Sequence, residues 1–366
     1  MAKRENSILT KVRNNILKIG LIENGDVIIV GLSGGPDSVF LLHLLDYLKE
    51  IFKAKYKIEY DVIACHVNHM IREEAKEDES LAKKYAEKLG FKFYSLKADV
   101  SKIAKEKKIS EEECGRDIRY EFFEKVLKEN NGTKIAVAHN ANDNAETVIH
   151  NFIRGAGLNG LSGIKFVNGK IIRPLLNIEK KDIVKYLDEN NIEYKVDRTN
   201  LTNDYTRNKI RNDLIKKVED EYNPSIVKSI NRMSKNVSED IEYINDMAKG
   251  EYKKVLIKKE ENSVLLNIKE FSNMHIAIQK RVALNAIQDL LGNVKSIEDK
   301  HIEDICELLR NSVTGKEFSI RTKFSILIEK NKVAKLQRKW CQIMRNENFG
   351  KNLKLYVKCD KVEQVK

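Results

Sequence analysis

The stretch VIIVGLSGGPDSVFLLHLL, residues 27–45, decides the fold of this chain. Its first part, Val27–Leu32, is a short β-branched apolar run, typical of a strand buried on both faces. From Ser38 to Ile51 the apolar residues recur at helical spacing instead. Between them lies the turn Ser33-Gly34-Gly35-Pro36-Asp37-Ser38. A buried strand that turns sharply into a helix is the first unit of an α/β fold.

The turn has the composition of an anion site. Gly34 and Gly35 let the backbone bend sharply and come close to a ligand. The N–H groups at the start of the helix point toward that ligand, and the helix dipole favours negative charge there. Ser33 and Ser38 add hydroxyl donors, and Pro36 gives up an N–H group that the helix start does not need. We therefore predict that the turn binds pyrophosphate.

Asp37 is the unexpected member of this turn. A carboxylate repels a phosphate unless a divalent cation lies between them, so the turn implies Mg²⁺. The alternative is that Asp37 only complements the dipole of its helix. The turn is not a Walker loop, because G-x-x-x-x-G-K-[ST] is absent. It does not match the dinucleotide fingerprint either.

Strand and helix signals alternate through the first half of the chain. After the stretch above, strands are predicted at 60–67, 92–96, 134–138 and 169–174, and helices at 77–89, 112–129 and 143–153. An amphipathic helix is predicted at the start, where apolar side chains recur from Ile8 to Ile19. Alternating strands and helices predict a doubly wound, mostly parallel sheet covered on both faces.

The second half has a different character. Helical periodicity continues through Pro224–Gly250 and Met274–Leu291, and β-type runs follow in Ser319–Leu336. We expect a catalytic domain over residues 1–217 and a mainly helical domain with a small β element over 218–340. Residues 341–366 would form a basic tail or part of a third domain.

Composition restricts the class of protein. The chain has 366 residues and a formal charge of +12, which favours a polyanionic partner such as nucleic acid, although a lysine-rich proteome would also explain it. The longest apolar runs are far short of the roughly 18 residues that span a bilayer, and no secretory signal is recognisable. Five cysteines without a C-x-x-C spacing argue against disulfides, zinc or a cluster, so we expect a cytoplasmic protein.

The turn at residues 33–38 resembles that of the PP-loop family, the N-type ATP pyrophosphatases. This resemblance implies an adenine nucleotide alpha hydrolase-like fold and cleavage of ATP between its α and β phosphates. Family members of the asparagine-synthetase type need a cysteine at the mature N-terminus, and this chain opens with Met1-Ala2-Lys3. The family's tRNA thiolases use cysteine pairs, whereas Cys65 and Cys114 are the only cysteines in the first half.

Further motifs resemble those of the tRNA(Ile)-lysidine synthase family, strongly over about residues 25–215. They are His66-Val67-Asn68-His69-Met70-Ile71-Arg72, Cys114–Phe123, Ala138–Thr147, Phe152–Leu158, Arg173-Pro174-Leu175-Leu176 and Asp197–Arg211. The chain departs from the family at Asn142, which replaces the first of two adjacent aspartates, and at Asn144, which replaces glutamine. A role that needs two adjacent carboxylates is in doubt, whereas a role for Asp143 alone survives.

This resemblance implies a reaction at the wobble cytidine of tRNA(Ile) with a CAU anticodon. ATP adenylates the C2 oxygen of the cytidine, the ε-amine of free L-lysine attacks C2, and AMP leaves. Asp143 lies at the carboxyl edge of the sheet, so we assign it with Asp37 to Mg²⁺, or to the amine of the substrate. Helix capping is the alternative for Asp143. His139 would orient the substrate or be a hydrogen-bonded structural residue.

Five arginines are candidates for contacts with phosphates. Arg116 and Arg119 lie three residues apart on one predicted helix, and surface ion pairs are the alternative for both. Arg154 precedes a glycine turn and would bind RNA phosphate or simply end its helix. Arg207 and Arg211 belong to a segment, 205–217, with five basic residues and one acid. A helix that follows the tRNA backbone fits this segment, and a solvated face is the alternative.

These patterns predict an ATP-dependent RNA-modifying ligase that uses Mg²⁺. One rival is another PP-loop tRNA modifier such as a thiolase, and a second is a non-catalytic RNA-binding relative. The oligomeric state stays open, with a homodimer among the alternatives.

Overall fold

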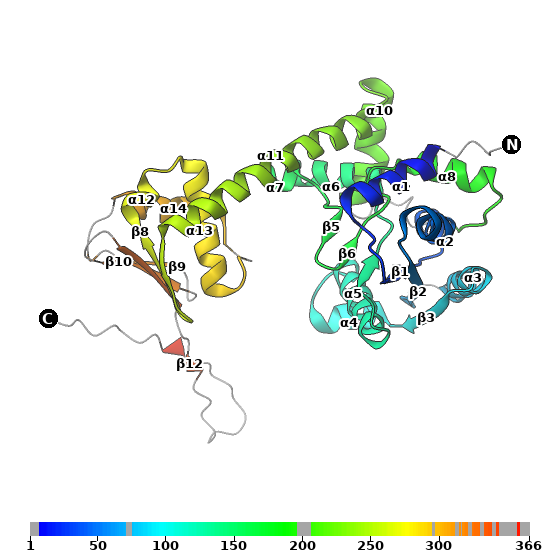
Figure 1. Cartoon of the computed structure of the whole chain (residues 1–366), viewed down its shortest axis with the longest axis horizontal. Helices are drawn as coiled ribbons and strands as arrows, with labels where there is room; N and C mark the ends of the chain where they lie inside the picture. Colours follow the sequence, from blue (N-terminus) through cyan, green and yellow to red (C-terminus); the bar gives the residue numbers. More distant parts are fainter. Residues whose placement is uncertain are drawn as a thin grey trace, which may run out of the picture. The chain divides into compact units, whose positions relative to one another are not determined.

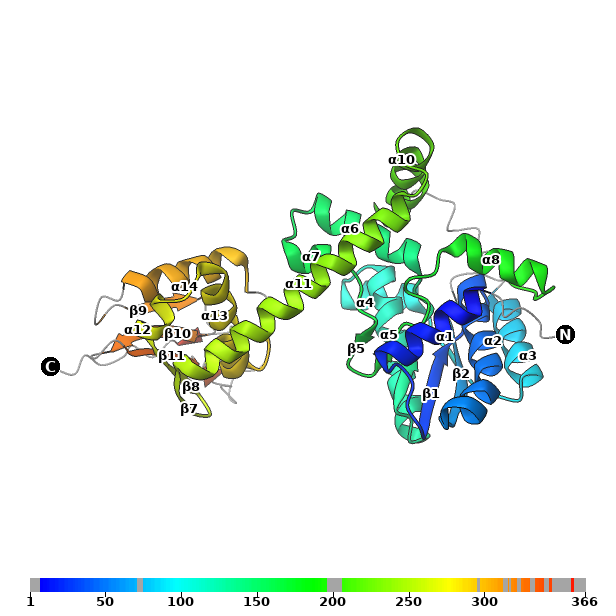
Figure 2. The ribbon, with the colours of Figure 1, turned by 45° about the horizontal axis from the view of Figure 1, so that its top comes forward.

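The computed structural model describes residues 7–70, 75–195, 206–294, 297–311, 315, 317–320, 324–329, 333–338, 342–343 and 357–358. The chain divides into two compact units, Met1–Ser238 and Glu239–Lys366. The first unit contains the mostly parallel sheet and the second contains an antiparallel sheet (Figures 1 and 2). Each unit has its own hydrophobic core.

The sheet of the first unit has the strand order β3-β2-β1-β4-β6-β5. Its strands are β1 (Asp26–Gly31), β2 (Tyr60–Asn68), β3 (Lys92–Lys97), β4 (Lys134–Ala136), β5 (Val167–Asn168) and β6 (Ile171–Ile172). All neighbouring pairs are parallel except β5 and β6, which are antiparallel. The chain winds outward from β1 in both directions, and the predicted doubly wound sheet is confirmed.

Helices cover both faces of this sheet. On one face, alternate β1 residues such as Ile28 and Val30 share a core with α1 (Ser7–Ile19), α2 (Pro36–Ile51), α3 (Ala75–Lys88) and α8 (Lys180–Glu189). On the other face, Ile29 packs with Phe123 of α5 (Glu111–Glu129). A Cβ at Gly31 would come within 2.8 Å of the Phe123 ring, so the end of β1 has room only for glycine. The strands are therefore apolar on both sides, as a doubly wound sheet requires.

The first unit has further helices, some between its strands in sequence and some after the last strand. They are α4 (Val100–Lys107), α6 (Ala141–Ile153), α7 (Leu158–Leu161), α9 (Thr206–Lys209), α10 (Lys216–Glu221) and the π-helices η1 (Phe52–Tyr56) and η3 (Ile210–Ile215). The long helix α11 (Ile226–Val255) begins in the first unit, where Ser234 donates to the carbonyl of Ser162 at 2.8 Å. It ends in the second unit.

The second unit combines a five-stranded antiparallel sheet with helices α12, α13 and α14 and the end of α11. The sheet order is β7-β8-β11-β10-β9, with β7 (Leu256–Lys259), β8 (Ser263–Asn267), β9 (Glu317–Ile320), β10 (Phe324–Glu329) and β11 (Val333–Arg338). Its core includes side chains from α12 (Ile268–Ser272), α13 (Ile276–Leu291) and α14 (Asp299–Asn311). A short pair, β12 (Gln342–Ile343) and β13 (Val357–Lys358), lies in the predicted tail, most of which is outside the described residues.

The described residues contain no helix long and apolar enough to cross a membrane. Cys65, Cys114 and Cys306 are buried free thiols, and burial raises the pKa of Cys65 to about 12.

Candidate functional site

The loop between β1 and α2 has the geometry of an anion cradle. Gly34 has a φ of +85°, in the left-handed region that glycine adopts without strain. Ser38 Oγ accepts a hydrogen bond from Ser33 N at 3.1 Å and donates to the carbonyl of Gly35 at 3.0 Å. Pro36 occupies the start of α2, and no side chain caps this helix. The helix start is therefore open toward a ligand.

Three helix N-termini meet beside this loop. Asn140 caps α6, and its Nδ2 donates to Asp37 Oδ1 of α2 at 3.0 Å. The backbone N of Asn140 donates to Asp143 Oδ2 at 2.9 Å, which completes a capping box. Asn142 Oδ1 accepts a hydrogen bond from Lys180 N, in the first turn of α8, at 3.0 Å. The positive ends of the dipoles of α2, α6 and α8 are thus joined at one place.

Asp37 and Asp143 face the same site. Burial, and then the negative charge of Asp143, raise the pKa of Asp37 to about 6. Lys180 and Arg211 oppose this effect on the pKa, and so does the hydrogen bond from Asn140. Two carboxylates whose charges repel each other beside an anion cradle are a good donor pair for a divalent cation.

Magnesium fits this donor set. The described residues contain no cluster of three or more His, Cys, Asp or Glu that could hold a metal. Mg²⁺ commonly binds through one or two carboxylates together with phosphate oxygens and water, so Asp37 and Asp143 would suffice as protein ligands.

His139 lies at the carboxyl end of β4, among cations. Arg173 Nε donates to His139 Nδ1 at 3.3 Å, and Arg173 Nη1 donates to the carbonyl of Lys165 at 2.7 Å. Burial lowers the pKa of His139 well below its usual value, with Arg173, Arg116 and Arg207 adding to the effect and Asp143 opposing it. The imidazole is therefore neutral near pH 7 and accepts through Nδ1.

Two more histidines, His66 and His69, lie at the end of β2 beside α5. His66 Nδ1 lies 2.8 Å from the carbonyl oxygen of Leu32, directly before the loop. His69 Nε2 lies 3.5 Å from Arg119 Nη2, and the His69 ring packs against Gly115, where a Cβ would lie 3.4 Å from the ring. Arg119 and Arg116 make no ion pair with another described residue, although Arg116 lies over the Tyr120 ring at 4.9 Å.

Arg207 and Arg211 both reach a carboxylate that is fully buried. Arg211 donates to Glu146 Oε1 at 2.6 Å and to Oε2 at 2.9 Å, and also to Asp143 Oδ1 at 3.3 Å. Arg207 donates to Glu146 Oε2 at 3.2 Å. Glu146 has no exposed surface. The two arginines therefore tie α9 and η3 to α6 and to Asp143.

Arg154 lies apart from the other candidates. It caps the C-terminal end of α6, and with 1.5 Å of rise per residue its Cα lies about 16 Å along the helix from Asp143. Arg154 is exposed, and so are Phe152 (70%), Ile153 (61%) and Leu158 (48%). This turn of Arg154 and three apolar side chains faces solvent.

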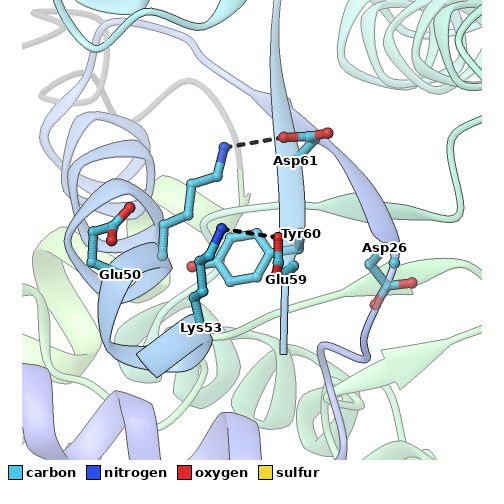
Figure 3. Close-up of a pocket in the computed structure, with 8 residues that line it drawn as sticks. Asp26, Glu50, Lys53, Glu59, Tyr60 and Asp61 are labelled. Atoms are coloured by element: carbon cyan, nitrogen blue, oxygen red, sulfur yellow. Dashed lines mark hydrogen bonds and ion pairs between the residues drawn. The ribbon is translucent and has the colours of Figure 1, made fainter. Parts of the chain in front are cut away.

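A hollow of about 330 Å³ lies at the opposite, amino edge of the sheet (Figure 3). It is lined by the starts of β1 and β2 and by the end of α2. Its lysines are paired, Lys49 with Asp61 at 3.0 Å and Lys53 with Glu59 at 3.2 Å. No predicted site residue lines it, so we assign it no function.

The sequence reasoning missed three contributors to the site. Asn140 and Glu146 lie inside the motif Ala138–Thr147, but the sequence analysis assigned no role to either residue. Lys180 follows the quoted Arg173-Pro174-Leu175-Leu176 motif by four residues. Glu146 offered a signal, because it stands within the buried face of an apolar helix, where a charge needs a partner.

A phosphate-binding loop at the carboxyl edge of a doubly wound sheet defines the class of PP-loop nucleotide-binding proteins. A family model described as a PP-loop domain matches residues 5–218. The chain is 42% identical over 315 residues to the tRNA(Ile)-lysidine synthase of Clostridium acetobutylicum, covering 86% of this chain and 66% of that protein. It is 39% identical over 328 residues to the enzyme of that name from Clostridioides difficile, with 89% and 70% covered. The chain belongs to the PP-loop family, and within it to the tRNA(Ile)-lysidine synthases.

The match spans only about two thirds of the length of these relatives. Among solved structures, the U34-tRNA thiolase NcsA from Methanococcus maripaludis has a TM-score of 0.51 and 22% identity, over 64% of this chain and 79% of that chain. At this identity the likeness shows a shared fold.

Proposed function

We propose that this protein is an ATP-dependent ligase that joins lysine to C2 of the wobble cytidine of tRNA(Ile) with a CAU anticodon. The observation that carries the proposal is the close likeness to tRNA(Ile)-lysidine synthases over most of the chain, through the PP-loop and its neighbours. In the reaction, the C2 oxygen attacks the α-phosphorus of ATP and pyrophosphate leaves. The lysine ε-amine then attacks C2, a proton is lost and AMP leaves.

The chain's own residues have distinct parts in this chemistry. The loop at residues 33–38 holds the phosphates by its N–H groups and hydroxyls, at the start of α2. Asp37 and Asp143 would hold Mg²⁺, which when bound would neutralise phosphate charge. Asp143 also faces the amine of the substrate. His139, in its neutral form, orients the nucleotide from the end of β4, and Arg116 does so from the first half of α5.

The surface of the first unit supports a polyanionic partner. Residues 147–178 contain three exposed basic side chains, Arg154, Lys165 and Lys170, a buried one, Arg173, and no acidic one. Arg154 and Arg119 are exposed, and we propose that they bind tRNA phosphates. Arg207 and Arg211 keep a proposed part in tRNA binding, and their contacts with Glu146 give them a structural part as well. The free thiols suit a cytoplasmic location.

The rival function is thiolation of tRNA, which would need a reactive cysteine. Cys65 is fully buried in the core between β2 and α5, and its raised pKa keeps it a thiol. We expect Cys65→Ser and Cys114→Ser to retain activity. Loss of activity in both variants, with unchanged folding, would favour a thiolase.

The deciding experiment supplies radiolabelled lysine, ATP and Mg²⁺ with a tRNA that carries a CAU anticodon. Acid-insoluble label should depend on all of these, and Ser33→Ala and Asp143→Asn should each abolish it. A tRNA with another anticodon is the control. ATP–pyrophosphate exchange without lysine incorporation would point to a different acceptor, and neither activity would point to a non-catalytic RNA-binding relative.

A further inference from the structure

A polar network joins the first turn of α6 to α11. The Asn231 side chain of α11 donates through Nδ2 to the carbonyl of Ala141, the first residue of α6, at 2.8 Å. It also donates to the carbonyl of Val227, one turn back on its own helix, at 2.8 Å. Asn231 Oδ1 accepts a hydrogen bond from Asn144 Nδ2 at 3.0 Å. This one amide therefore contacts the start of α6 at two residues.

Asn144, the partner of Asn231 on α6, is fixed in its place. Its side chain is buried, and its Oδ1 accepts a hydrogen bond from the backbone N of Ile164 at 2.6 Å. Its Nδ2 also lies 3.5 Å from Oγ of Ser234, which is buried on α11. A Cβ at Gly163 would collide with Asn144 Oδ1, so the amide is closely surrounded. A buried polar network whose members are paired specifies one arrangement of the helices that carry it.

The same two helices share apolar contacts. Ala141 and Ala145 of α6 belong to a buried cluster with Val227 of α11 and with Ile210 and Ile215 of η3. Because alanine is small, α11 can come close enough for a short asparagine side chain to reach the backbone of α6. Apolar burial has no preferred direction, whereas hydrogen bonds require a defined geometry. The amides therefore set the register in which the two helices meet.

The first turn of α6 carries groups of the candidate site. Asn140 caps α6 and donates to Asp37 of the phosphate loop at 3.0 Å, and Asp143 lies in the same turn. This end of the helix is attached by the backbone N of Ala141, which donates to the carbonyl of Ile178 at 2.9 Å, and by the network with α11. A shift of the start of α6 would move both groups relative to Asp37.

We propose that Asn231 is a positioning residue for the ligase reaction. It acts through the backbone of Ala141 and through Asn144, and it sets the place of Asn140 and Asp143 relative to the phosphate loop. The inference rests on the proposed function, because it assumes that these two groups of α6 serve the adenylation step.

Two variants of Asn231 test the inference in the lysine incorporation assay. Asn231→Asp keeps the size of the side chain but removes the donor to the carbonyl of Ala141, and Asn231→Ala removes the whole amide. Both should lower kcat about tenfold or more, because a small displacement of reacting groups slows the chemistry strongly. KM for tRNA should stay within a few fold of the native value. Asn236→Ala, exposed on the same helix, is the matched control and should behave as the native chain does.

A second measurement does not depend on turnover. Calorimetry of inorganic pyrophosphate with Mg²⁺ reports on the groups that face the phosphate loop. Its affinity should weaken in both Asn231 variants and stay native in Asn236→Ala.

A purely structural role for Asn231 predicts a different outcome. Loss of a structural contact lowers the melting temperature, but it leaves kcat per folded molecule unchanged well below that temperature. All rates are therefore measured where each variant is fully folded. Asn144→Ala and the double variant with Asn231→Ala complete a mutant cycle. If the two amides act as one unit, the double variant should be little slower than the slower single variant, and losses of kcat that multiply would contradict the inference.

Native kcat in both Asn231 variants would overturn the inference and leave the proposed ligase intact, and so would an equal loss of kcat in Asn236→Ala. If the native protein incorporates no lysine, the proposed function fails and the pyrophosphate measurement decides the inference alone. Native affinity in both Asn231 variants would then overturn it. If the native protein also binds no pyrophosphate, the inference fails together with the proposed function.

Discussion

At the scale of the single residue, the backbone of Gly34 shapes the phosphate loop. Its φ of +85° is costly for any residue with a Cβ, although the nearest atom, the carbonyl oxygen of Asp78, leaves room at 3.8 Å. Gly34→Ala should therefore lower the free energy of unfolding by about 1–2 kcal/mol through backbone strain alone. Urea denaturation of the ligand-free protein measures this.

Gly35→Ala is the matched control for this prediction. Gly35 has an ordinary φ of −74°, and a Cβ there would make normal contacts at 3.5 Å with Ser33 Oγ and 3.9 Å with the carbonyl of Lys195. It should change the stability little. Equal losses in the two variants would show that crowding, and not backbone conformation, limits the loop.

His69 makes the stability of this region depend on pH. Burial, Arg119 and His66 lower the pKa of His69 from 6.5 to about 4. The folded protein therefore binds fewer protons here than the unfolded chain, so stability is fully present above about pH 6.5 and is lost as the pH falls toward 4. Each unit of pKa corresponds to about 1.4 kcal/mol, which sets an upper limit of about 3.5 kcal/mol, and solvent screening at this half-buried ring reduces the contribution below that limit.

Comparison of the native protein with His69→Gln isolates this contribution. Unfolding free energies measured between pH 7 and pH 4 should fall less steeply in the variant. His66 remains in it, and burial lowers the pKa of that residue too, so part of the slope should persist. Parallel curves for the two proteins would contradict the assignment to His69.

At the scale of the element, Glu146 joins α6 to α9 and η3. A buried charge that loses its partner is strongly destabilising, whereas the pair itself adds little to stability. Arg211→Met leaves Glu146 with Arg207 alone and should cost about 3 kcal/mol in thermal or chemical unfolding. The exposed Arg232 on α11 is the control, and Arg232→Met should stay within about 0.5 kcal/mol of the native protein. A loss for Arg211→Met no larger than for this control would show that water reaches Glu146 readily.

Most elements of the first unit could be predicted because their signals are local. The apolar run at 27–32 became β1 (26–31), and the helical spacing from Ile8 to Ile19 became α1. The helices that were missed include α4 and α8. In α4 only Val100 and Ala104 are buried, which is too weak a pattern, whereas α8 carries buried Ile183, Tyr186 and Leu187 at helical spacing and could have been found.

At the scale of the whole molecule, the site is assembled from segments that are far apart in the chain. The sequence predicted that the ends of β1 and β4 would meet, because parallel strands place their carboxyl ends at one edge. It did not predict which side chains would pair across that edge. The contact between Arg211 and Glu146 joins residues 65 positions apart, and α8 brings Lys180 to the loop from beyond β6. Such pairings depend on how helices pack, and hydropathy alone does not encode them.

The charge of the whole chain bears on how it would hold tRNA. With a net charge of +12 and an acid-free segment at 147–178, binding should release counterions and weaken steeply with salt. Each phosphate contact contributes about 0.7–0.9 to the slope of log K against log salt. Arg154→Ala should therefore reduce that slope by about one contact, measured by filter binding of tRNA between about 50 and 200 mM salt. Lys55→Ala is the control, because Lys55 is exposed and belongs to η1 at the opposite edge of the sheet. This variant should leave the slope unchanged. The salt slope could stay the same in Arg154→Ala, or it could fall equally in both variants. Either result would mean that the turn after α6 makes no specific phosphate contact and that only the overall positive charge attracts the RNA.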